Sequence, residues 1–197
     1  MNSGVPQRLL LVSCLCGILG AIAGSLAHPM PAHGGEISGV WLDVPFIQQE
    51  KNGCGSASIA MVMQYWQMQQ GGTLDASSDP IAIQRQLYST QAQGVYASGM
   101  ERYFQQHGFR TFVFSGTWDD LKRHLEKGRP LIVALKPMPG ETALHYVVVA
   151  GLDWQQNLVL VNDSAQRKLL KEDRARFEKE WNSVGHWTLL ALPQSQK

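Results

Sequence analysis

Hydrophobic and polar positions follow different patterns in the two halves of the chain. From Cys54 to Trp66, apolar residues fall on nearly every side of the helix that the segment would form. Such a pattern is typical of a helix that is buried all round rather than one that lies on a surface. Three further segments, 79–89, 98–109 and 117–130, carry helix start and stop signals and predict shorter helices.

The start of each shorter helix is marked by capping residues. Asp79 precedes Pro80, which suits the first helical position because proline lacks an N–H that would be unpaired there. Ser98 and Glu101 have the spacing of a capping box. Thr117 begins the third segment. The two aspartates in its first turn suit a helix start, because the positive end of the helix dipole stabilises their negative charges.

The second half contains β-branched and apolar runs that predict strands. These runs lie at 131–137, 145–153, 158–163 and 186–193. Turn-like segments separate the first three runs, and links this short favour antiparallel hairpins over crossovers. A further short helix is expected at 171–181, before the last strand. Helices first and an antiparallel sheet afterwards make an α+β fold.

The composition indicates a single globular domain. The 197 residues are 44% hydrophobic and 17% charged, which is enough chain for a real core. The formal net charge is +1 and no basic stripe is present, so nothing favours nucleic acid or an anionic membrane as a partner. No cysteine or histidine pair has the short spacing of a zinc site, so we expect neither a metal nor another cofactor.

The N-terminus has the order of a secretory signal peptide: one positive charge, an apolar run, and small residues before a cleavage point. We expect a signal peptide at 1–27 with cleavage after Ala27, and after Ala23 as the second choice. A linker rich in proline, glycine and histidine follows at 28–39, and the domain covers 40–197. The protein is therefore expected to be exported, to a periplasm or to the extracellular space.

Two alternatives would keep the protein at a membrane. "LVSC" looks like a lipoprotein signal whose Cys14 is lipidated, although the apolar stretch before it, 9–13, is short for such a signal. The apolar run could also stay uncleaved as an anchor, although it is short for a stable membrane span.

Removal of the signal peptide would leave Cys54 as the only cysteine, because Cys14 and Cys16 lie in the leader. A lone cysteine cannot form an intramolecular disulfide, so it is a buried inert thiol, an intermolecular link or a reactive thiol. Cys54 falls where a loop becomes the buried helix, and the positive end of the helix dipole favours a thiolate there. Gly53 and Gly55 are expected to leave room for a substrate backbone.

A cysteine nucleophile needs a base, and the base needs a group that orients it. His145 begins the most strand-like run of the chain, next to a loop, where it is well placed to face a cleft. Asn162 and Asp163 end the next strand, and alternation lets only one of them face His145; Asp163, which ends the apolar run, is preferred. Gln48, six residues before Cys54, could hold an oxyanion together with the Cys54 backbone N–H.

Three segments resemble the papain-like peptidases that cut double-glycine leaders from bacteriocin precursors, and resemble their stand-alone relatives still more closely. They are "VPFIQQEKNGCGSASIAMVM", "LHYVVVAGLD" and "LVLVNDSAQ". The resemblance implies a papain-like fold, with an N-terminal helical half packed on an antiparallel sheet. It implies Cys54 as nucleophile, Gln48 in the oxyanion hole, His145 as base and Asp163 as the orienting aspartate. Family members often have proline where Ser164 and Ser56 stand, which leaves the substrate subgroup open.

The resemblance implies a cysteine peptidase that takes a peptide or protein substrate. Export is expected from the N-terminal sequence instead, and we also expect a monomer that uses no cofactor. Three alternatives remain at this point. The chain could be an inactive module of the same fold that binds peptides without cutting them. It could also be a cysteine amidase that acts on cell-wall peptides, or transfer an amide instead of hydrolysing it.

Overall fold

The computed structural model describes residues 39–136 and 144–194. The predicted signal peptide, with Cys14 and Cys16, and all of the predicted linker except Gly39 lie outside the described residues. Within the described part of the chain, none of the helices combines the length and the apolar character that crossing a bilayer requires.

The described chain contains helices and strands in an interleaved order. The helices are α1 (Cys54–Gln69), the short 3-10 helix η1 (Ala76–Ser78), α2 (Pro80–Leu87), α3 (Ala97–Gln106), α4 (Trp118–Leu125) and α5 (Arg174–Asn182). The strands are β1 (Gly39–Trp41), β2 (Tyr88–Ser89), β3 (Gly94–Val95), β4 (Phe109–Ser115), β5 (Leu131–Leu135), β6 (His145–Asp153), β7 (Leu158–Asp163), β8 (Arg167–Asp173) and β9 (Trp187–Pro193).

An antiparallel sheet forms the centre of the domain. Six strands follow the order β4-β9-β5-β6-β7-β8, and β1 pairs with β6 outside this path. All of these pairings are antiparallel, as the short links between the predicted strands indicated. The predicted α+β fold, with N-terminal helices packed on an antiparallel sheet, is confirmed.

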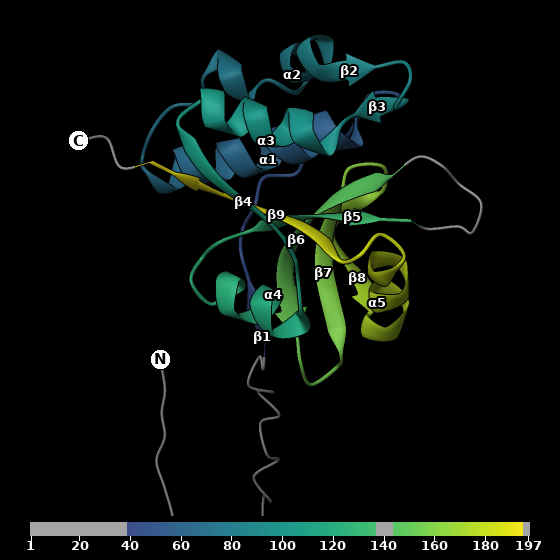
Figure 1. The fold of residues 1–197 in the computed structure, drawn as a ribbon. Coiled ribbons are helices and arrows are strands. Elements are labelled where there is room, and N and C mark those ends of the chain that lie inside the picture. Colours follow the sequence, from purple (N-terminus) through teal and green to yellow (C-terminus); the bar gives the residue numbers. More distant parts are fainter. Residues whose placement is uncertain (1–38, 137–143, 195–197) are drawn as a thin grey trace, which may run out of the picture. The chain divides into compact units, whose positions relative to one another are not determined.

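The sheet is buried on both faces. Alternate residues of β5 point to opposite sides: Ile132 and Ala134 belong to the core under α1, α2 and α3, whereas Val133 and Leu135 belong to the core with α4 and α5. Figure 1 shows α1, α2 and α3 on one side of the sheet and α4 and α5 on the other. This second helical layer explains why β5 and β6 read as continuous apolar runs instead of alternating ones.

Helix α1 is the buried helix that the sequence predicted, and it continues to Gln69. Ile59 and Met61 are completely buried, between the sheet and the neighbouring helices. Burying one such side chain stabilises the fold by about 1.5–3 kcal/mol. Since α1 contacts β6 closely, its packing fixes the position of its first residue, Cys54, relative to the sheet.

Two of the predicted helix starts are confirmed and one is wrong. Asp79 accepts a hydrogen bond from the N–H of Ala82 at 2.7 Å, and Thr117 forms a capping box with Asp120. Helix α3 begins at Ala97 without a side-chain cap, so Ser98 lies inside its first turn and makes no capping box. The β2–β3 hairpin ends at Val95, so α3 begins two residues after it, with Tyr96 between them.

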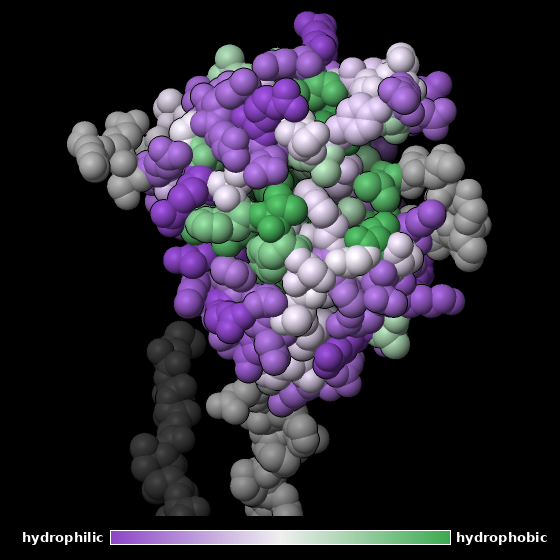
Figure 2. Space-filling model, in the orientation of Figure 1, coloured by the Kyte–Doolittle hydropathy of each residue, from purple (hydrophilic) through white to green (hydrophobic). Residues whose placement is uncertain are grey.

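Strands β1, β2, β3, β4 and β8 were not predicted, and β2 occupies the last two residues of the helix predicted at 79–89. Helix α5 begins at Arg174 because residues 171–173 complete β8. Strand β4 is an edge strand whose Phe112 and Val113 are exposed, so its pattern lacks a clear alternation. The guanidinium of Arg110 lies 5.1 Å from the Phe112 ring centre. Figure 2 shows apolar side chains gathered across the middle of this face, where β4 and β9 lie in Figure 1.

Candidate active site

Cys54 is the first residue of α1 and is half-buried at the edge of a cleft. A tight turn leads into the helix, in which the N–H of Gly53 donates to the carbonyl of Glu50 at 2.9 Å. No described side chain caps this helix end, so the backbone N–H of Cys54 stays available to a ligand in the cleft. The thiol lies 3.9 Å from the carbonyl oxygen of Leu144.

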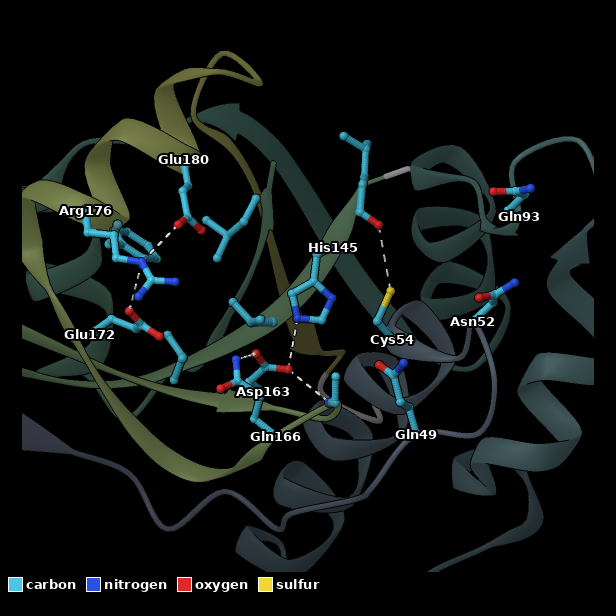
Figure 3. A pocket seen from close by; sticks show the side chains of 16 residues that line it. Gln49, Asn52, Cys54, Gln93, His145, Asp163, Gln166, Glu172, Arg176 and Glu180 are labelled. Carbon is cyan, nitrogen blue, oxygen red and sulfur yellow. Dashed lines mark hydrogen bonds and ion pairs between the residues drawn. The ribbon is translucent and has the colours of Figure 1, made fainter. Parts of the chain in front are cut away.

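The structure brings His145 and Asp163 together, and Asn162 faces away from this pair. His145 is the first residue of β6 and Asp163 the last of β7, and these neighbouring strands are antiparallel. Nε2 of His145 lies 2.9 Å from Oδ1 of Asp163. The other ring nitrogen of His145 points toward Cys54 (Figure 3). The three side chains therefore form a line from thiol to imidazole to carboxylate.

The charges of these groups stabilise one another. Burial alone would disfavour the imidazolium, but hydrogen bonds to Asp163 and Cys54 and the negative charges of both outweigh it and raise the pKa of His145 to about 10. Burial likewise disfavours the Asp163 carboxylate. The hydrogen bond and charge of His145, together with the N–H groups of Ala165 and Gln166, outweigh burial and lower the pKa of Asp163 below its ordinary value.

Two N–H groups that follow Asp163 hold its carboxylate. The backbone N–H of Ala165 donates to Oδ1 at 2.9 Å, and Nε2 of Gln166 donates to Oδ2 at 2.6 Å. Gln166 was not among the site residues predicted from the sequence. Its signal was its place three residues after an aspartate in a turn, where a side chain can reach back to the carboxylate.

The structure does not bring Gln48 to the cleft. Gln48 is exposed, whereas its neighbour Gln49 is half-buried and lines the cleft with Cys54. Figure 3 shows the Gln49 amide extending toward Cys54. The prediction of Gln48 as the oxyanion donor therefore does not fit this geometry, because the residue one position further along faces the site.

The glycines beside Cys54 are closely packed against neighbouring residues. A Cβ on Gly55 would lie 2.9 Å from Cβ of Val95, and one on Gly53 would lie 2.5 Å from Oε1 of Gln84. Real Cβ atoms essentially never approach this closely, so both positions admit only glycine without a local shift.

The cleft has a volume of about 370 Å³ and continues from the catalytic line toward α5. Its apolar surface comes from residues on the α5 face of the sheet and on α5 itself, namely Leu135, Val147, Val161 and Phe177. Its far rim carries Arg176, whose Nε lies 3.1 Å from Glu180 and 3.7 Å from Glu172. Figure 3 shows this trio across the cleft from Cys54.

The described residues contain no group of three or more histidine, cysteine, aspartate or glutamate side chains arranged to hold a metal ion. The arrangement in the cleft has instead the parts of nucleophilic catalysis: a thiol at a helix N-terminus, an imidazole that faces it, and a carboxylate that orients the imidazole.

A family model described as the Peptidase_C39 like family matches residues 41–188. The chain belongs to the Peptidase_C39 like family. The matched range contains Cys54, His145 and Asp163 together with the rest of the cleft. Membership of this peptidase family implies a cysteine peptidase, and it confirms the resemblance found in the sequence. No curated protein sequence matches the chain.

Solved peptidase structures have the same fold. A protein described as a C39-like peptidase from Bacillus anthracis is 20% identical, with a TM-score of 0.63 over 80% of this chain and 99% of that one. The peptidase domain of Streptococcus ComA, an ABC transporter, is 22% identical and has a TM-score of 0.57. The match covers 76% of this chain and 98% of that domain. A double glycine motif protease from an AMS/PCAT transporter, solved in complex with the leader peptide, is 19% identical and has a TM-score of 0.58. The match covers 79% of this chain and 95% of that one.

Proposed function

We propose that this Peptidase_C39 like protein is an exported cysteine peptidase that hydrolyses peptide bonds with Cys54, His145 and Asp163. The observation that carries the proposal is the line of these three side chains along one cleft, with the Asp163 carboxylate 2.9 Å from the imidazole. A thiol at a helix N-terminus, beside an oriented imidazole, is the arrangement that activates a cysteine nucleophile.

The reaction follows from the positions of these groups. The Cys54 thiolate forms a bond to the scissile carbonyl carbon, and the carbonyl oxygen becomes an oxyanion. The C–N bond then breaks while the His145 imidazolium gives its proton to the leaving nitrogen, which leaves a thioester and a free amine. Water gives a proton to His145 and its oxygen attacks the thioester. The C–S bond breaks, the acid leaves, and the thiolate and imidazolium are restored.

The backbone N–H of Cys54 and the amide of Gln49 hold the oxyanion in this proposal. Cys54 and Gln49 both line the cleft, and Figure 3 shows the Gln49 side chain beside Cys54. Donors that are already oriented toward a developing negative charge stabilise the transition state without reorganising during the reaction.

The proposed substrate is an extended peptide that lies along the cleft. One structural neighbour, the double glycine motif protease, was solved with a leader peptide, which supports a peptide ligand for this fold. The proposed export rests on the N-terminal sequence, whose charge, apolar run and small residues have the order of a signal peptide.

Hydrolysis of a mixture of quenched fluorescent peptides, some of them containing Gly-Gly, tests the proposal. We expect the purified protein to cleave at least one of these peptides and the Cys54→Ala variant to cleave none. A protein that binds the peptides and leaves them intact would be a binding module, and the peptidase proposal would be wrong.

A further inference from the structure

The end of β7 holds the segment that carries Gln49. Side chains alternate along a strand, so Asp163 faces the cleft while Asn162 and Ser164 face away from it, toward residues 44–49. Nδ2 of Asn162 donates to the carbonyl of Val44 at 3.1 Å, and Oδ1 accepts from the N–H of Leu169 at 2.9 Å. One strand end thus positions the catalytic carboxylate on one side and the segment before Cys54 on the other.

Ser164 makes two hydrogen bonds to Gln49. Its carbonyl accepts from the backbone N–H of Gln49 at 3.0 Å, and its hydroxyl donates to Oε1 of the Gln49 side chain at 2.9 Å. Ser164 is completely buried, so water cannot easily replace these bonds. Leaving the buried hydroxyl without a hydrogen-bond partner would destabilise the folded protein, which favours the bonded arrangement.

These bonds determine which end of the Gln49 amide faces the thiol. An unrestrained side-chain amide can rotate by about 180°, which exchanges the positions of its oxygen and its NH₂ group. A serine hydroxyl could also accept from the NH₂ group of a flipped amide, but the buried Ser164 hydroxyl makes no other hydrogen bond among the described residues, so its proton would then lack an acceptor. The arrangement in which Oε1 accepts from this hydroxyl is therefore favoured, and it leaves the NH₂ group as the end that can donate into the cleft. An amide that had turned over would present its oxygen to an oxyanion and would repel it.

We infer that Ser164 is a positioning residue of the active site: its hydroxyl orients the Gln49 amide so that Nε2 donates to the oxyanion. The inference rests on the proposed peptidase function. It adds to that function a residue that does not line the cleft and that acts only through Gln49.

A double-mutant cycle on peptide hydrolysis tests the inference. Ser164→Ala should lower kcat about 10-fold with KM nearly unchanged, and Gln49→Ala should lower it about 100-fold, as expected for loss of an oxyanion donor. In the Gln49→Ala background, Ser164→Ala should have no further effect, because its target is gone. Ser164→Thr, which keeps the hydroxyl, should recover most of the kcat lost in Ser164→Ala.

Two further measurements separate positioning from general damage. Alkylation of Cys54 by iodoacetamide needs no oxyanion hole, so Ser164→Ala should leave its rate within about twofold of the wild-type rate. The matched control is Ser58→Ala, which removes another completely buried hydroxyl, one that bonds to the Tyr146 carbonyl and makes no bond to Gln49. Ser58→Ala should leave kcat unchanged.

Multiplicative effects of Ser164→Ala and Gln49→Ala would overturn the inference, and so would an unchanged kcat in Ser164→Ala. Equal losses of kcat and alkylation in Ser164→Ala would show a structural role and would overturn it as well. If the wild-type protein cleaves no peptide, the proposed function itself fails and the inference fails with it. That outcome is distinct from active protein with independent mutational effects.

Discussion

Nε2 of His145 lies 2.9 Å from Oδ1 of Asp163, although 18 residues separate the two in the chain. The hairpin of β6 and β7 creates this contact, because the first residue of one strand meets the last residue of the other. The carboxylate in turn is held by two N–H groups beyond the end of β7. The pair is therefore built by the sheet and is ready before any substrate arrives.

Replacing Asp163 with asparagine should lower the pKa of His145. The pKa is raised to about 10 although burial opposes it, and both the hydrogen bond and the negative charge of Asp163 contribute to the increase. Asparagine has nearly the same shape but no charge, so the pKa should fall by at least about one unit. A pH titration of the His145 ring by NMR measures it. A pKa that stays near 10 in Asp163→Asn would contradict the electrostatic account.

The raised pKa of His145 also predicts how stability depends on pH. The imidazolium is favoured in the folded state, so its contribution is fully present below the unfolded pKa of 6.5 and is lost as pH rises toward about 10. Its size is on the order of a few kcal/mol. Urea unfolding of wild type and His145→Gln measures it: the wild-type advantage should be larger at pH 6 than at pH 10. An advantage that grows with pH would have the wrong sign.

Gln49 and Gln48 form a matched pair for testing the oxyanion hole. The two residues are chemically identical neighbours, but only Gln49 lines the cleft. Gln49→Ala should reduce kcat for peptide hydrolysis about 100-fold. Gln48→Ala removes an exposed side chain and should change kcat by less than about twofold. The reverse order of effects would restore the assignment that the sequence suggested.

The export proposal predicts the N-terminus of the mature protein. Expression of the 197-residue chain in a bacterium should yield protein that starts at His28, after cleavage behind Ala27. Mass spectrometry of the purified protein determines its first residue. A lipidated Cys14 would indicate a lipoprotein instead, and an intact Met1 on protein retained in the cytoplasm would contradict export.

Segments buried on both faces were the easiest to predict from sequence. Strand β5 is apolar throughout, and α1 and β6 are apolar over most of their length, because neighbouring layers cover both of their sides. Strand β8 has only Leu170 buried, and β4 exposes Phe112 and Val113, so neither shows a clear period of two. Their extended form comes from pairing with β7 and β9, which a local pattern does not contain.

The candidate site divides in the same way. Cys54, His145 and Asp163 stand at ends of elements that the sequence predicted well, so their meeting could be anticipated. The choice between the two adjacent glutamines could not be made from the sequence, because a loop has no periodicity that shows which side chain faces inward. The contact of Gln49 with Ser164 makes that choice, and it joins residues 115 positions apart.

The most direct test of the account is the rate at which iodoacetamide alkylates Cys54 as a function of pH, followed by mass spectrometry of the peptide that carries this residue. His145→Ala is measured beside the wild type. We predict fast alkylation of wild type at pH 6–7, where an ordinary thiol is almost entirely protonated, and a large loss of rate in His145→Ala. Equal rates that rise only near the ordinary thiol pKa of about 8.5 would contradict the thiolate–imidazolium pair and, with it, the proposed peptidase.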